Sequence, residues 1–112
     1  MGKNKLFIFE FVSGGGFSNF KTPSSLFCEG FGMLRTIIED FKLLNFEINT
    51  LLDYRGSSLS EYLKADRIEI IKDKEDYLIK FGTEIEKSDF CFIIAPEFSK
   101  HLYKLTEIAK NS

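Results

Sequence analysis

The chain has few of the residues from which metal and disulfide sites are built. Its 112 residues include two cysteines and one histidine. Cys28 and Cys91 lie far apart, each among apolar neighbours and without a Cys-x-x-Cys spacing, so we expect two reduced, buried thiols in a cytoplasmic protein. His101 stands alone on a polar stretch, and no histidines, cysteines or acids cluster around it. We therefore expect no metal site.

Long apolar runs and an excess of charge of one sign are missing too. No run approaches the ~20 apolar residues that a membrane-spanning helix needs, and no small-residue cleavage site follows the basic start, so a signal peptide is not expected. The 15 basic and 17 acidic residues are interleaved and leave a formal net charge of −2. This balance argues against nucleic acid and against a membrane surface as partners.

Three common enzyme motifs do not occur. There is no Gly-x-Gly-x-x-Gly, and Asp53, which ends a predicted strand, lies much further from the glycines than the ~20 residues typical of a ribose-binding acid. A P-loop, Gly-x-x-x-x-Gly-Lys-Ser/Thr, is missing as well. Ser13 has neither a Gly-x-Ser-x-Gly context nor a nearby base. NAD or FAD binding, P-loop chemistry and serine hydrolysis are therefore not expected.

Aromatic residues, in contrast, are plentiful. The chain contains 13 phenylalanines, and 44% of its residues are hydrophobic. This is enough apolar material for the core of one small domain, residues 1–112. So many phenylalanines in so short a chain predict that some pack against another domain or subunit, and we expect self-association as a homodimer.

The stretch that organises the chain is an apolar run, residues 5–12, followed by Gly14, Gly15 and Gly16. Such a run is typical of a strand that is covered on both faces. Only Glu10 interrupts it, and a carboxylate there is costly unless it is paired or lies at an open end. The glycines allow positive φ angles and a close approach of the backbone to another group.

Helical and extended patterns alternate along the rest of the chain. Thr22 and Pro23 predict the start of a long amphipathic helix, residues 23–44, which Asn45 ends. Gly30 inside it costs about 1 kcal/mol relative to alanine, which indicates close packing on the sheet. Further strands are expected at 46–52, 68–71 and 90–95, a helical turn at 59–64, and helices at 73–88 and after Ser99. The continuously apolar run 90–95 predicts a strand that is central or covered on both faces.

This order predicts an α/β fold: a Rossmann-like, three-layer α/β/α domain with a parallel four-stranded sheet in the order 3-2-1-4. The carboxyl ends of parallel strands meet at one edge, where ligands of such sheets bind. Lone acids at strand ends are also commonly helix caps, which is the favoured interpretation of Asp53 but a weaker one for Glu10. The residues expected at this edge are Glu10, Ser13–Gly16, Asp53, Arg55, Pro96 and Glu97. The expected core includes Phe7, Phe9, Ile38, Phe41, Phe92 and Ile94.

Four segments, taken together, resemble the N-terminal region of ATP-grasp ligases. They are Phe9–Phe17, Glu29–Leu34, Leu51–Arg55 and Ile94–Glu97, the last followed by Leu102–Thr106. The resemblance is greatest to the archaeal-type group that includes tyramine–L-glutamate ligase of methanofuran biosynthesis, and it covers nearly the whole chain. It implies a pre-ATP-grasp domain. In that family a lid domain and a catalytic domain follow and hold ATP and Mg²⁺, and residues 1–112 contain no counterpart of them.

The resemblance implies a parent reaction in which ATP drives amide formation through an acyl-phosphate. It implies that this chain is not catalytic alone, and that its partners are the remaining ATP-grasp domains and a small-molecule amine or amino acid. The glycine-loop N–H groups would hold a carboxylate or phosphate oxygen, and Glu10 an amine. A stand-alone α/β module that binds a small anion or a partner protein is the alternative. The substrate-binding positions implied are Glu10, Ser13, Gly14, Gly15, Gly16, Glu29 and Glu97.

Overall fold

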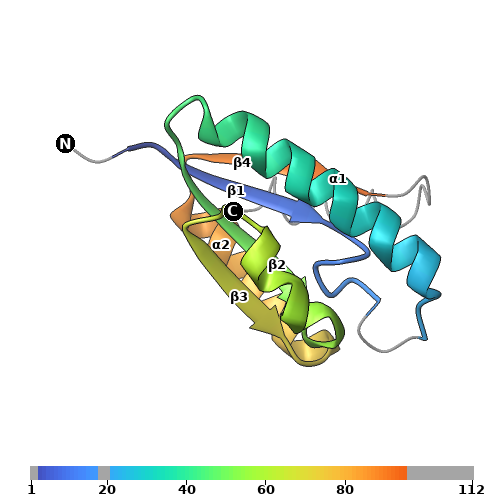
Figure 1. Ribbon diagram of the computed structural model, residues 1–112. Coiled ribbons are helices and arrows are strands. Elements are labelled where there is room, and N and C mark those ends of the chain that lie inside the picture. Colours follow the sequence, from blue (N-terminus) through green and yellow to red (C-terminus); the bar gives the residue numbers. More distant parts are fainter. Residues whose placement is uncertain (1–2, 18–20, 96–112) are drawn as a thin grey trace.

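The computed structural model describes residues 3–17 and 21–95, and these ranges form the alternating strands and helices that the sequence predicts. In chain order the elements are β1 (Lys5–Glu10), α1 (Ser24–Lys42), β2 (Glu47–Asp53), the 3-10 helix η1 (Tyr54–Tyr62), β3 (Arg67–Ile71), α2 (Lys74–Lys87) and β4 (Phe90–Ile94) (Figure 1). The predicted last helix, with Ser99 as its cap, lies outside the described residues.

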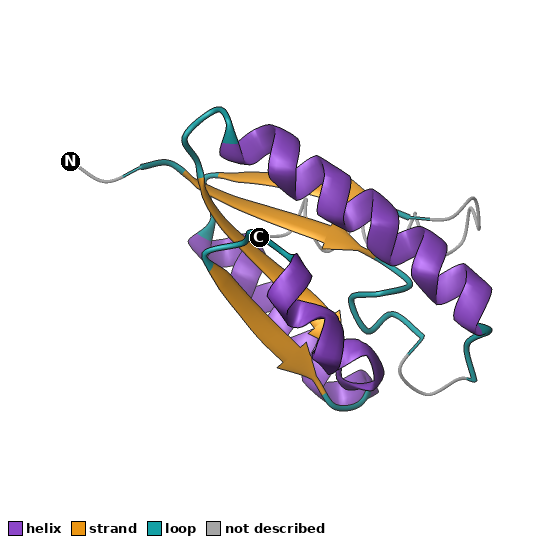
Figure 2. Cartoon of the chain, viewed as in Figure 1, coloured by secondary structure: helices purple, strands orange, loops and turns teal. Residues whose placement is uncertain are grey.

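The four strands form one sheet in the order β3-β2-β1-β4, and every pairing is parallel. Helices flank the sheet, with α1 and η1 packed on one face and α2 on the other (Figure 2). The predicted fold class and strand order are therefore confirmed. Leu6 pairs with Ile48 of β2, and Ile8 pairs with Phe92 of β4, so β1 lies in the middle of the sheet. Its pairing with β4 continues to Glu10, whereas its pairing with β2 ends at Phe7.

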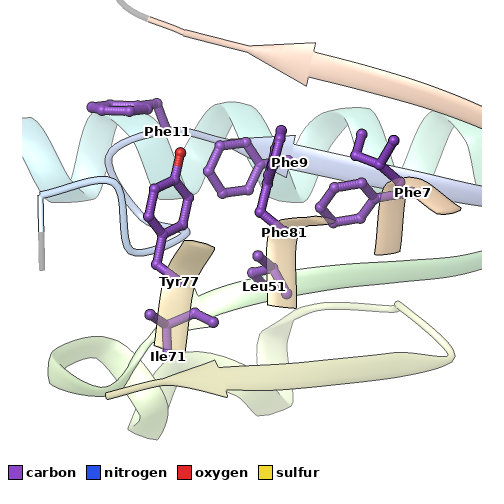
Figure 3. Close-up of a cluster of buried hydrophobic side chains, with 8 residues drawn as sticks. Phe7, Phe9, Phe11, Leu51, Ile71, Tyr77 and Phe81 are labelled. Atoms are coloured by element: carbon purple, nitrogen blue, oxygen red, sulfur yellow. The ribbon is translucent and has the colours of Figure 1, made fainter. Parts of the chain in front are cut away.

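The face of the sheet under α2 is built from aromatic rings. Successive side chains of a strand point to opposite faces, which sends Phe7 and Phe9 of β1 toward α2. The Phe9 ring lies 4.9 Å from that of Phe81 and 5.7 Å from that of Tyr77, centroid to centroid (Figure 3). Burial in this cluster raises the pKa of the Tyr77 phenol. Several of the phenylalanines therefore pack together in the core on this face of the sheet.

The apolar side of α1 packs on the opposite face of the sheet. Phe31, Leu34 and Ile38 recur at helical spacing and pack on Leu6 and Ile8 of β1.

Six core residues were expected from the sequence, and the structure separates them into three groups. Phe7, Phe9 and Ile38 are fully buried, Phe41 and Ile94 are partly buried, and Phe92 is 37% exposed. The prediction for Phe92 is therefore wrong.

Strand β4 is less covered than its composition predicts. It lies at the edge of the sheet, with Phe90 53% exposed. The expectation of a central or doubly covered strand is wrong, because the apolar composition of a run does not determine which elements pack against it.

Cys28 and Cys91 are both free thiols, as expected, but both are exposed, so their predicted burial is wrong too. Partial burial, together with the charge of Glu84, nevertheless raises the pKa of Cys91.

Element boundaries shift by a few residues from the predicted ones. β1 ends at Glu10 and not at Val12, because the chain turns there. α1 begins at Ser24, with Pro23 and not Thr22 in the capping position and no side-chain cap bond. Asn45 follows the end of α1 with φ of 66°, a left-handed conformation that ends helices. The helical turn expected at 59–64 overlaps η1, which begins earlier and ends at Tyr62.

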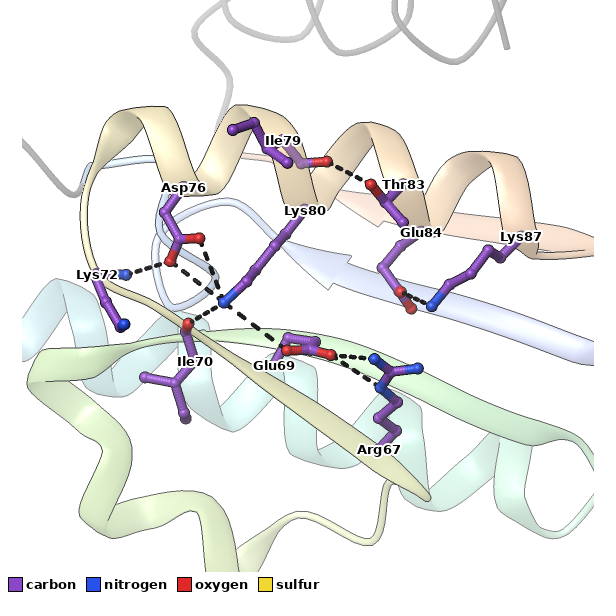
Figure 4. A network of polar contacts seen from close by, with 10 residues as sticks. All are labelled: Arg67, Glu69, Ile70, Lys72, Asp76, Ile79, Lys80, Thr83, Glu84 and Lys87. Carbon is purple, nitrogen blue, oxygen red and sulfur yellow. Dashed lines mark hydrogen bonds and ion pairs between the residues drawn. The ribbon is translucent and has the colours of Figure 1, made fainter.

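A polar network ties α2 to β3. Lys80 Nζ donates to the carbonyl of Ile70 at 3.0 Å and pairs with Asp76 at 3.3 Å (Figure 4). Glu84 is also buried, and its Oε2 pairs with Lys87 at 3.0 Å. Within the described residues, however, its Oε1 has no hydrogen-bond partner. Ion pairs at the surface, such as those of Lys80 and Lys87, stabilise a fold by about 1 kcal/mol or less. A buried acceptor without a hydrogen bond, in contrast, destabilises it by about 1–3 kcal/mol.

Replacing Glu84 by methionine should therefore raise the free energy of unfolding, by about 1 kcal/mol, because it removes a desolvated carboxylate and leaves Lys87 free to reach water. Urea denaturation followed by circular dichroism measures the change. Glu86→Met on the same helix is the control, since Glu86 is exposed and should change stability by less than about 0.5 kcal/mol. A loss of stability in Glu84→Met would mean that the Lys87 pair matters more than the unpaired oxygen.

Candidate functional site

The carboxyl edge of the sheet brings together segments that are far apart in the sequence. Glu10 ends β1, and Ser13 lies in the loop that follows it. Asp53 ends β2, and its N–H donates to the carbonyl of Ser13 at 2.7 Å. Gly30 of α1 packs on the Glu10 carboxylate. The described edge residues are therefore in contact, as the parallel sheet predicts, while Pro96 and Glu97 lie outside the described residues.

The Glu10 carboxylate is buried, and the loop that follows β1 supplies every hydrogen bond that it accepts from the described residues. Oε2 accepts from the N–H of Val12 at 3.0 Å. Oε1 accepts from the N–H of Ser13 at 2.6 Å and from its hydroxyl at 2.7 Å. Glu10 is 1% exposed and forms no ion pair with the part of the chain that the structure describes. Hydrogen bonds satisfy the buried carboxylate and offset the cost of its burial, but the carboxylate does not face an open ligand site.

The three glycines let the loop fold tightly over the aromatic cluster. Gly15 has φ of +100°, and a Cβ there would lie 2.6 Å from Ile71. The N–H of Gly14 donates to the Glu10 carbonyl at 2.8 Å, and that of Gly16 to the Phe11 carbonyl at 2.9 Å. With the N–H groups of Val12 and Ser13 on the Glu10 carboxylate, four loop donors are engaged within the chain. They are not available to a substrate anion in this conformation.

The expected close packing of Gly30 is confirmed, and the group that it meets is the Glu10 side chain. A Cβ at this position would lie 2.4 Å from Oε1 and 2.7 Å from the carboxylate carbon. Only glycine allows α1 to approach the end of β1 this closely. Its neighbour Glu29 is exposed on the same helix.

Asp53 and Arg55 form a second fixed element of the edge. Asp53 is fully buried, and its Oδ1 accepts from the N–H of Arg55 at 2.9 Å and from Nε at 3.0 Å. The guanidinium also donates to Oδ2 at 2.6 Å and to the Phe17 carbonyl at 2.9 Å. The hydrogen bond to Asp53 raises the pKa of Arg55. Asp53 thus caps η1, which was the favoured interpretation of this acid, and it orients Arg55.

Two openings lie beside these fixed groups. A cavity of about 190 Å³ at the start of α1 is lined by Thr22, Ser24, Phe27, Cys28 and Arg55. A larger groove of about 700 Å³ runs between α1 and β4. Its described lining is apolar except for Thr36 and one acid, Glu29. The lining residues are Glu29, Gly32, Met33, Thr36, Ile37, Phe92 and Ile94.

The groove combines an apolar floor with a single carboxylate, which suits a ligand that carries an ammonium group on an apolar body. The sequence resemblance names Glu29 as a substrate contact, but it does not reveal the groove. Two signals were available. Glu29, Met33 and Thr36 recur at helical spacing beside the buried stripe of α1, and alternate residues of β4 share one face.

In the described part of the chain, no group of three or more histidines, cysteines and acids is placed to hold a metal ion. Within the same ranges, no helix is long and apolar enough to cross a membrane. Comparison with known protein families finds no matching family, and comparisons with curated proteins and with solved structures find no significant match.

Proposed function

We propose that this chain is the substrate-side N-terminal domain of an ATP-dependent carboxylate–amine ligase of the ATP-grasp type. It would act in the cytoplasm and would form an amide only together with the lid and catalytic domains, which would hold ATP and Mg²⁺. The observation that carries the proposal is the interlocking of three segments that resemble those ligases. Gly30 packs on Glu10, and Asp53 donates to Ser13, at the edge where α/β sheets bind ligands.

In this proposal the groove between α1 and β4 receives the amine substrate. Glu29 is exposed at the groove and binds the ammonium group, while Met33 and Phe92 contact the apolar part of the substrate. Glu10, Ser13 and the glycines contribute by fixing the position of α1 and of the loop. Methanofuran biosynthesis is the pathway that the resemblance implies for the ligase.

The second candidate is a stand-alone module that binds a small anion. The cavity at the start of α1 favours it, since Arg55 and Ser24 both line a space of about 190 Å³. An oxyanion there would meet a cation and hydrogen-bond donors. Binding of a partner protein at the exposed apolar side of β4, by a second copy or by the remaining domains, is compatible with either function.

The ligase proposal predicts that residues 1–112, incubated with ATP, Mg²⁺, an amine and an amino acid, form no amide and release no phosphate above background. Phosphoryl transfer needs cations and metal aligned on the γ-phosphate, and at the described edge the Arg55 guanidinium is hydrogen-bonded to Asp53. Addition of the lid and catalytic domains should restore turnover. Amide and phosphate are measured in the same samples, and turnover by the chain alone would refute the proposal.

Within the full-length ligase, Glu29→Gln should raise the KM for the amine about tenfold, because it removes the charge that binds the ammonium group, and should leave the KM for ATP unchanged. Glu39→Gln is the matched control on the same helix, because Glu39 pairs with Arg35 on the surface and does not line the groove. Equal effects of the two substitutions would exclude Glu29 as the amine-binding residue.

A further inference from the structure

The turn after β1 has the properties of an anion-binding site. The N–H groups of Val12 and Ser13 and the Ser13 hydroxyl donate to the two oxygens of one carboxylate, at 2.6–3.0 Å. Successive backbone N–H groups arranged in this way form a concave nest that binds anions. Here the anion is already present, because the nest holds the carboxylate of Glu10.

We propose that this turn is a carboxylate-binding site whose resident ligand is the Glu10 side chain, and that removal of this side chain leaves a site for a small free monocarboxylate such as acetate or formate. The walls of the site are closed. Ser13 is fully buried, and Gly30 of α1 covers the side of the carboxylate that the turn leaves open. A ligand held from all sides in this way is a permanent part of the fold.

The geometry also determines which anions fit. The two carboxylate oxygens have separate donors, with Val12 on one and Ser13 on the other. A planar monocarboxylate reproduces this pattern, whereas chloride offers one centre only. Phosphate is larger, and the backbone of Gly30 lies against the place that its extra oxygens need. The glycine-rich turn is therefore an internal carboxylate site and not a phosphate loop. This role follows from the contacts of the turn and holds whether or not the chain serves a ligase.

Glu10→Ala tests the proposal, because alanine leaves a space that acetate matches. The thermal unfolding midpoint of the variant is measured against sodium acetate, with sodium chloride at equal ionic strength. We expect a saturable rise of about 5 °C at an acetate concentration ten times its Kd, and no such rise in the unsubstituted chain, where the site is filled. Glu10→Ala combined with Ser13→Ala should respond much less to acetate, because one donor is lost. An equal response to acetate and chloride would overturn the proposal.

A second measurement covers the case in which Glu10→Ala does not fold in chloride. Acetate should then restore the far-ultraviolet circular dichroism spectrum, and failure to restore it would count against the site.

Glu10→Gln supplies an independent check. Its amide keeps the shape but presents an NH₂ group to a backbone donor, so its unfolding midpoint should fall and acetate should not raise it. A Glu10→Gln chain as stable as the unsubstituted one would show that the nest does not require a carboxylate.

Discussion

Replacing Gly30 by alanine should destabilise the chain by about 2–4 kcal/mol. The added methyl group would lie 2.4 Å from Glu10 Oε1, closer than real Cβ contacts ever come. The carboxylate cannot yield without cost, since three hydrogen bonds hold it and Ser13 is fully buried. Either α1 moves away from the end of β1, or the carboxylate leaves its donors unpaired in the interior.

Gly32→Ala is the matched control, two residues further along α1. Gly32 is exposed, and a Cβ there would meet no atom within 4 Å. Alanine is favoured over glycine in a helix by about 1 kcal/mol, so this variant should be more stable than the unsubstituted chain. Urea denaturation followed by circular dichroism compares the two. If both substitutions stabilise the chain, the close contact between Gly30 and Glu10 does not exist in solution.

The order of strands and helices could be predicted because each element has a strong local pattern. Phe31, Leu34 and Ile38 mark the buried stripe of α1, and the apolar run that ends at Glu10 marks β1. Parallel strands joined by helices then leave few possible topologies. Local pattern and tertiary contacts agree in these elements, so the strand order 3-2-1-4 follows from the sequence.

Coverage of a face could not be predicted, because it depends on which elements meet in space. Phe92 and Phe9 occupy similar apolar runs, yet one lines an open groove and the other is fully buried. Cys28 and Cys91 were expected to be buried for the same reason and are exposed. The sheet order places β4 at an edge, and that position outweighs its composition.

The candidate site was predictable by position but not by contact. The resemblance assigns the amine to Glu10 and names Glu29 as a further substrate contact, whereas the structure gives the two acids different surroundings. Glu10 is 1% exposed, and Glu29 lies at the open groove. What separates them is the turn after Glu10, whose N–H groups point back at the carboxylate. Backbone directions in a turn depend on φ and ψ angles that several glycine-containing sequences can adopt, so the sequence alone did not reveal this pairing.

Phe9→Ala should be the most damaging single truncation of the core, with a loss of about 3–5 kcal/mol. Small domains have a total stability of about 5–15 kcal/mol, so this loss is a large share of the free energy of unfolding. The reason is the position of the ring at the centre of the cluster under α2. Phe9 is fully buried, and four aromatic rings have their centroids within 6.5 Å of its own: Phe7, Phe11, Tyr77 and Phe81.

Phe92→Ala on the neighbouring strand is the control that makes this loss informative. Phe92 is 37% exposed, and the ring of Phe41 lies 5.4 Å away, so its truncation should cost about 1 kcal/mol or less. In the full-length ligase the same truncation should raise the KM for the amine, because it removes part of the apolar groove floor. Thermal unfolding midpoints of both variants give the comparison. Equal losses would mean that a partner segment covers the groove in solution, and the amine would then have to bind elsewhere.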